Sequence, residues 1–201
     1  MLVIQNQPQP FKQLIEEYNS SFDANFMFLN STLLSSLKVS SRNSVSFFSP
    51  RRWRKDLKSL QVVALKNLKL QAPEDGVQVI ARQIVSLSQT IANGNPYEFV
   101  THVPGGSSGR AWNFAALIAY SVAKELGVPH QPAFIGSTSS IARSSHPSKA
   151  RYFRPGYCEG VITGSFGLLV DDVATTGTHF EKCLEVLRKH DKSVVCISWI
   201  S

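Results

Sequence analysis

The chain has 201 residues, of which 43% are hydrophobic and 17% are charged, and these values favour one folded domain over a fully disordered chain. No run approaches about eighteen apolar residues, so a membrane-spanning helix is not expected. The three cysteines form no Cys-x-x-Cys motif, which argues against a zinc site or a disulfide scaffold. No secretory signal is visible at the start, and we therefore expect a cytoplasmic protein.

The N-terminal residues 1–55 are expected to form an accessory segment that acts as a lid or hood on a main domain of residues 56–201. A short helix is predicted over residues 11–18, and aromatic residues such as Phe26 and Phe28 require a packing partner. Residues 51–75 carry seven basic and three acidic side chains. Trp53 within this basic segment is either a stacking residue for a single-stranded nucleic acid or, the interpretation we favour, a core anchor in a solvated turn.

The main domain is predicted to alternate strands with helices. Strands are predicted over residues 60–65, 98–103, 131–135, 168–170 and 193–200, and helices over residues 77–91, 114–126 and 180–187, from the spacing of the apolar residues and from the Gly, Asn and Pro residues that follow. Residues 136–160 show no period and collect basic side chains, which predicts a long loop and a candidate active-site flap. We therefore expect an α/β fold with a mostly parallel, twisted sheet and helices on both faces.

Residues 167–178 join a predicted buried strand to a helix through two carboxylates and a loop of small residues, Gly-Leu-Leu-Val-Asp-Asp-Val-Ala-Thr-Thr-Gly-Thr. Ligands bind at the carboxyl ends of strands in open parallel sheets. The loop amides, the threonine hydroxyls and the positive end of the following helix suit a phosphate, and Asp171 and Asp172 suit the hydroxyls of a ribose. The spacings of a Walker loop and of a dinucleotide-binding turn are absent. The pattern favours a ribose 5-phosphate site over an acidic turn before a capped helix.

This segment closely resembles the phosphoribosyl-pyrophosphate signature of the type I phosphoribosyltransferases, and residues 110–129 are similar to the ComF-like branch of that family. The resemblance implies that Asp171 and Asp172 hold the 2- and 3-hydroxyls. It assigns the 5-phosphate to a loop of Ala174, Thr175, Thr176, Gly177 and Thr178. It assigns the pyrophosphate to a loop of Pro104, Gly105, Gly106, Ser107, Ser108 and Gly109, followed by Arg110. The flap candidates are Arg143, Lys149 and Arg151.

The family resemblance implies transfer of a phosphoribosyl group from 5-phosphoribosyl 1-pyrophosphate, with Mg²⁺ held through pyrophosphate and water rather than by direct protein ligands. Asp171, Asp172 and Arg110 are the candidate catalytic residues. His102 and His179 flank the two loops and are candidates for proton transfer, although histidines in such places more often have structural roles.

The net charge of +7 favours polyanionic partners, and a pocket for a phosphorylated sugar donor or a nucleotide accounts for it. One alternative is a non-catalytic relative that senses a nucleotide or binds nucleic acid, which is possible but less favoured. A scaffold protein ranks last. No membrane partner is expected, and a homodimer is the expected assembly.

Overall fold

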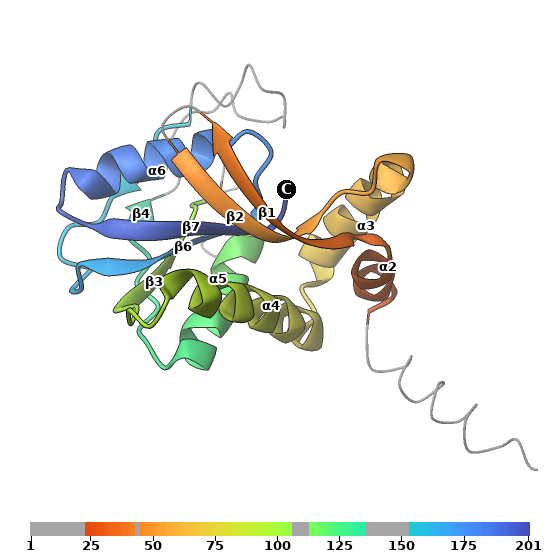
Figure 1. Cartoon of the computed structure of the whole chain (residues 1–201), viewed down its shortest axis with the longest axis horizontal. Helices are drawn as coiled ribbons and strands as arrows, with labels where there is room; N and C mark the ends of the chain where they lie inside the picture. The colour runs from red at the N-terminus through yellow and green to blue at the C-terminus, as the bar shows by residue number, and fades with distance from the viewer. Residues whose placement is uncertain (1–22, 43–44, 106–112, 136–152) are drawn as a thin grey trace, which may run out of the picture.

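The computed structural model describes residues 23–42, 45–105, 113–135 and 153–201 (Figure 1). A five-stranded sheet has the order β1-β2-β7-β6-β3, in which β1 is antiparallel to β2 and all other neighbours are parallel. The strands of this sheet are β1 (Leu34–Arg42), β2 (Val45–Arg52), β3 (Phe99–His102), β6 (Phe166–Val173) and β7 (Ser193–Ile200). The sheet is mostly parallel, as the sequence predicted.

Helices cover both faces of the sheet, as Figure 1 shows for α6 on one side and α4 and α5 on the other. The described helices are α2 (Ala24–Thr32), α3 (Lys58–Gln71), α4 (Glu74–Ala92), α5 (Phe114–Leu126) and α6 (Thr178–Arg188), with a 3-10 turn η1 (Lys55–Leu57) before α3. Alternate residues of β6 point into the two layers: Leu168 and Val170 pack with α4 and α5, whereas Leu169 packs with α6. None of the described helices is long and apolar enough to cross a membrane.

The predictions for α4, α5, α6, β3 and β7 are confirmed to within a few residues. α4 ends where Asn93 takes a left-handed conformation with φ 47°, and α5 ends at Gly127 with φ 69°. The strand predicted over residues 131–135 is shorter than expected, because only Phe134–Ile135 form a strand, which lies outside the five-stranded sheet. Just before it, His130 forms an isolated parallel bridge with Val100 of β3.

The predicted strand over residues 60–65 is wrong, because these residues lie in α3. Buried residues of α3 recur at helical spacing, namely Gln61, Ala64, Leu65 and Leu68. A polar residue at the start of this buried stripe, together with Leu60 and Val63 on the exposed side, hides the helical period in the sequence.

Two predicted loops are shorter than expected. The loop after the central strand begins at Ala174, because β6 continues through both carboxylates and Val173. The long loop predicted over residues 136–160 contains a short strand, β5 (Gly156–Tyr157), which pairs antiparallel with β4 (Phe134–Ile135). Residues 136–152 of that segment lie outside the described residues.

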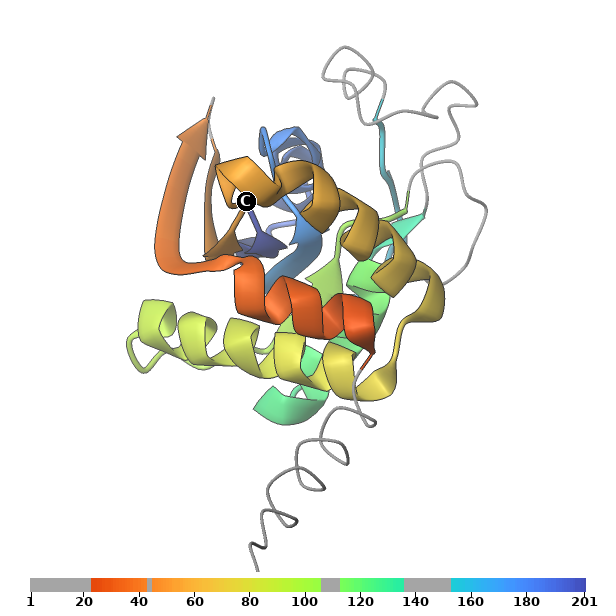
Figure 2. The same cartoon turned by 90° about the vertical axis from the view of Figure 1, so that its right-hand side faces the viewer.

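The N-terminal segment shares its core with the rest of the chain. β2 hydrogen bonds to β7 in parallel, and Phe47 of β2 packs against Phe180 of α6 with ring centroids 5.6 Å apart. Figure 2 shows α2 stacked between α3 and α4, and Phe26 of α2 packs directly over Gly76 in the first turn of α4. The predicted helix over residues 11–18 lies outside the described residues, and a hood made of residues 1–55 stays a prediction.

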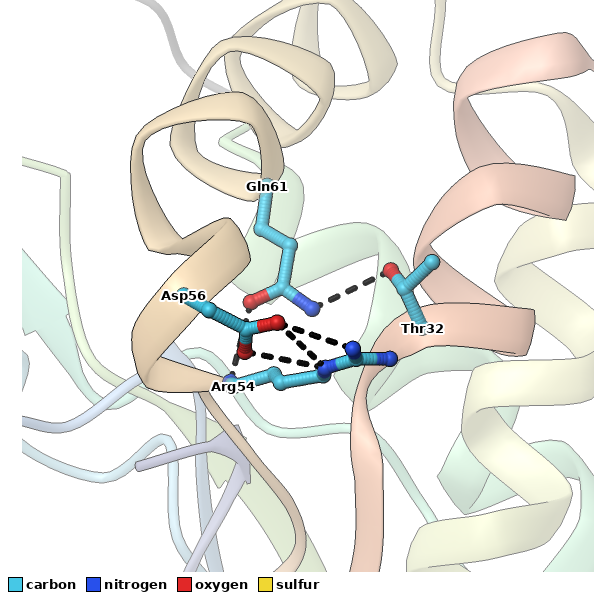
Figure 3. Close-up of polar contacts among 4 residues, drawn as sticks. All are labelled: Thr32, Arg54, Asp56 and Gln61. Atoms are coloured by element: carbon cyan, nitrogen blue, oxygen red, sulfur yellow. Dashed lines mark hydrogen bonds and ion pairs between the residues drawn. The ribbon is translucent and has the colours of Figure 1, made fainter.

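A polar cluster fixes the start of α3 against α2 (Figure 3). The side chain of Gln61 is buried; its carbonyl accepts from the Arg54 backbone N–H at 3.0 Å and its amide donates to Thr32 Oγ1 at 3.1 Å. Arg54 also pairs with Asp56 through two nitrogens at 2.8–3.1 Å. Because Gln61 uses both of its polar atoms, α3 has one position relative to α2.

Candidate functional site

The candidate site lies at the carboxyl edge of the parallel strands. The backbone N–H of Val103, just after β3, donates to Val170 O at 2.9 Å, and Ala174 N–H, just after β6, donates to Ile200 O at 3.0 Å. Since β3 and β6 are neighbours, the loops predicted for pyrophosphate and for 5-phosphate leave the sheet side by side.

The loop that follows β6 presents a row of backbone donors. In the described part of the chain, the N–H groups of residues 175–180 donate to no protein acceptor, and the first hydrogen bond at this end of α6 runs from Glu181 N–H to Gly177 O at 2.9 Å. No side chain caps this end of the helix. Unused amides at the positive end of a helix bind anions, so this loop has the donors that a phosphate group requires.

The conformation of this loop depends on Gly177. Gly177 has φ 73°, and a Cβ atom on it would lie 2.9 Å from the ring of Phe47. Thr175 is exposed, and Thr176 and Thr178 are half-buried with their hydroxyl oxygens 3.0 Å apart. The threonine hydroxyls therefore stay near the surface beside the unused amides instead of filling the core.

The two carboxylates sit in different surroundings, although both residues are buried. Asp171 Oδ1 accepts from the backbone N–H of Asp172 at 2.8 Å. Burial raises the pKa of Asp171 well above its usual value, the charge of Asp172 raises it further, and Lys69 acts in the opposite direction. Burial of Asp171 beside a second carboxylate therefore favours its protonated form.

Asp172 forms an ion pair with Lys69, which comes from α3. The Asp172 side chain is 12% exposed and the Lys69 side chain 37% exposed, so the pair lies at the border of the protein and the solvent. No hydrogen-bond donor in the described residues reaches Asp172 Oδ2 apart from this ammonium group. In the sequence, Lys69 is only one of the basic residues of segment 51–75, because its approach to Asp172 depends on the tertiary position of α3.

The neighbouring loop begins with Pro104 and Gly105, which approach the start of α5. Asn113 caps α5: its Oδ1 accepts from Ala116 N–H at 2.7 Å, and its amide donates to Val103 O at 3.1 Å. A Cβ atom on Gly105 would lie 3.1 Å from Asn113 Nδ2, so the chain passes close to this cap. Asn113 thus ties the end of β3 to the helix, and its place just before an apolar helical stripe is the sequence signal of an N-cap.

The two candidate histidines occupy different places. His102 is buried at the end of β3 with its Nδ1 3.1 Å from His130 Nε2, and burial together with the charge of His130 lowers the pKa of His102 to about 4. His179 lies in the first turn of α6, where its ring is 4.4 Å from that of Phe153. Desolvation lowers the pKa of His179, while the carboxylate of Asp172 raises it. His179 is accordingly the histidine that stands beside the acidic pair.

Several predicted site residues lie outside the described residues. These are Gly106, Ser107, Ser108, Gly109 and Arg110 of the second loop and Arg143, Lys149 and Arg151 of the flap. The structure thus brings together the acidic pair, the loop predicted to bind the 5-phosphate and the first two residues of the loop predicted to bind pyrophosphate.

The basic segment makes contacts within the protein. Arg51 donates to Gln83 at 3.0 Å, to Asn30 at 2.9 Å and to Ser35 at 2.5 Å, and Trp53 packs against the core cluster on the α4 and α5 side of the sheet. These contacts agree with the interpretation of Trp53 as a core anchor.

Among the comparisons with known proteins, only the comparison with solved structures finds similar chains. No protein-family model matches the chain, and no curated protein sequence matches it. Among solved structures, the chain is similar to adenine phosphoribosyltransferase from Saccharomyces cerevisiae, crystallised with D-2,5-dideoxy-2,5-imino-altritol 1,6-bisphosphate and adenine. The TM-score is 0.42 and the identity 12%, over 89% of this chain and 97% of that chain. What the site binds therefore has to be inferred from the residues of this chain.

Proposed function

We propose that this protein binds a phosphorylated ribose and acts as a phosphoribosyltransferase on 5-phosphoribosyl 1-pyrophosphate. The observation that carries the proposal is the row of unused backbone N–H groups over residues 175–180, directly after a strand that ends in Asp171 and Asp172. The amides hold the 5-phosphate, and Asp172 accepts hydrogen bonds from the sugar hydroxyls.

The reaction itself requires positioning and charge neutralisation more than a protein nucleophile. Because β3 and β6 are neighbours, Pro104 and Gly105 begin a glycine-rich loop next to the end of the strand that carries the acidic pair. His179, whose pKa is lowered by burial and raised by the charge of Asp172, is the candidate for proton transfer with the acceptor. Mg²⁺ bound to the pyrophosphate would neutralise the leaving group. We expect Mg²⁺ to arrive with the donor and to be held through pyrophosphate and water, because Mg²⁺ keeps several of its own waters and binds substrate phosphates.

The binding step is tested by calorimetric titration of inorganic phosphate, ribose 5-phosphate and the pyrophosphorylated donor. Asp172→Asn removes the charged acceptor. We expect it to weaken the binding of ribose 5-phosphate by about tenfold or more and to leave the binding of phosphate alone unchanged. Asp191→Asn, the same change at an exposed site, is the control. Unchanged ribose 5-phosphate affinity in Asp172→Asn would place the sugar elsewhere.

Catalysis is distinguished from nucleotide sensing by turnover. A mixture of the protein, Mg²⁺, labelled donor and candidate bases should release pyrophosphate if the protein is a transferase. Tight binding of the donor without pyrophosphate release for any base would instead favour the non-catalytic sensor, which uses the same site.

A further inference from the structure

A cation from the N-terminal half of the chain lies in the candidate sugar site. Lys69 lies in the last turn of α3, and its side chain reaches the border of the protein and the solvent. Its ammonium group contacts Asp172 Oδ2, and the described residues supply no other donor to this oxygen. A sugar hydroxyl that binds Asp172 must therefore compete with Lys69 or share the carboxylate with it.

The ion pair has the properties of an exchangeable contact. The Lys69 side chain is more than a third exposed, so water can solvate its ammonium group when that group leaves Asp172. A lysine has a flexible four-carbon stem, so its ammonium can move from one anion to another without movement of the helix. Gln61, in contrast, fixes the position of α3 itself.

The chemistry of the donor gives this cation a second anion to bind. The 2-hydroxyl and the pyrophosphate of 5-phosphoribosyl 1-pyrophosphate stand on adjacent carbon atoms, so a carboxylate that holds the hydroxyl lies close to the first phosphoryl group. An ammonium group beside Asp172 is then within reach of that phosphoryl group. Ribose 5-phosphate has the same hydroxyls but no anionic group at this carbon.

We propose that Lys69 is a ligand-responsive cation and a specificity residue of this site. In the empty protein it neutralises Asp172, so that the carboxylates repel an incoming anion less. When the donor binds, Lys69 turns to the pyrophosphate and Asp172 accepts the sugar hydroxyls. Lys69 thereby favours pyrophosphorylated ribose over ribose 5-phosphate. This inference rests on the proposed function.

The test compares affinities for the two ligands by calorimetry in wild type and in Lys69→Met, which keeps the length of the side chain and removes its charge. We expect Lys69→Met to bind the pyrophosphorylated donor at least about tenfold more weakly and ribose 5-phosphate equally well or better. Lys66→Met, an exposed lysine of the same helix, should match wild type for both ligands. Lys69→Arg, which restores the charge, should recover part of the lost affinity.

Thermal unfolding of each variant shows whether the variant is folded before its affinities are compared. If Lys69→Met does not fold, Lys69→Gln is used, because its amide can still donate to Asp172, and the same loss for the donor is expected. An unchanged ratio of the two affinities in the neutral variant would overturn the proposal and leave Lys69 as a structural counter-ion. If wild type binds neither ligand, the proposed function itself fails, and the inference fails with it.

Discussion

Gly177 lies where the candidate phosphate loop contacts the hydrophobic core. Its left-handed φ of 73° begins α6, and the missing side chain leaves room for Phe47 of β2. The same residue therefore gives the loop its conformation and allows the N-terminal hairpin to pack beneath it.

Gly177→Ala is expected to lower the free energy of unfolding by about 2–4 kcal/mol, because it adds a contact with the Phe47 ring to the cost of a left-handed alanine. Gly160→Ala is the matched control: Gly160 also has φ 73°, but a Cβ atom there meets nothing within 4 Å. Chemical denaturation measures both. Equal losses in the two variants would show that Phe47 does not restrict this position.

The lowered pKa of His102 leads to a prediction of how the free energy of unfolding depends on pH. Its pKa is lowered from 6.5 to about 4 in the folded protein, chiefly by burial, so the unfolded chain takes up a proton before the folded one does. Stability contributed by the neutral imidazole is complete above pH 6.5 and is lost as the pH falls toward 4, by up to about 3 kcal/mol. In chemical denaturation at a series of pH values, His102→Asn should lose less stability between pH 6.5 and 4 than wild type, whereas His190→Asn should lose as much as wild type. An equal loss of stability in His102→Asn and in wild type would show that His102 is not its cause.

Among single residues, Asp171, Asp172 and the loop of residues 174–178 could be proposed from the sequence as a candidate site, because a strand, two acids and a loop of small residues follow one another directly. Lys69 could not be recognised, because the helix that brings it to Asp172 was itself predicted as a strand.

At the level of elements, α3 decides how the N-terminal half reaches the site. Its buried side consists of Gln61, Ala64, Leu65 and Leu68. Gln61 hydrogen bonds both to the turn before the helix and to Thr32 of α2. Its exposed side carries Leu60, Val63 and Leu70, so hydrophobicity alone does not distinguish the two sides.

Gln61→Ala removes the acceptor for the Arg54 N–H and the donor to Thr32 at once. We expect a loss of about 1–3 kcal/mol in the free energy of unfolding, since a poorly solvated N–H is left without a partner. Lys66→Ala on the exposed side should change stability by less than about 0.5 kcal/mol. A loss in Gln61→Ala no larger than in the control would mean that the cluster in Figure 3 does not fix α3.

For the whole molecule, β2 is the element that connects the two halves of the chain. It lies between β1 and β7, and the hydroxyls of Ser49 on β2 and Ser198 on β7 are buried 2.7 Å apart. Phe26 and Leu29 of α2 belong to the same apolar cluster as α4 and α5.

A chain that begins at residue 56 is therefore expected not to fold cooperatively, because it exposes one edge of β7 and the surfaces that Phe47 and Phe26 cover. Circular dichroism melting and binding of a hydrophobic dye, with the full chain as reference, measure this. A sharp melting transition in the shortened chain would show that residues 56–201 form an independent domain.

The sequence by itself determined the α/β pattern, the helices α4, α5 and α6, the strands β3 and β7, and the motif of acids and small residues at the candidate site. These features depend on the spacing of neighbouring residues, which sets helix period, strand burial and loop chemistry. Only the tertiary structure decided that β2 enters the sheet beside β7, that residues 58–71 form a helix and that Lys69 meets Asp172. Those features depend on contacts between residues far apart in the chain, and no local pattern records which distant surface a segment will cover.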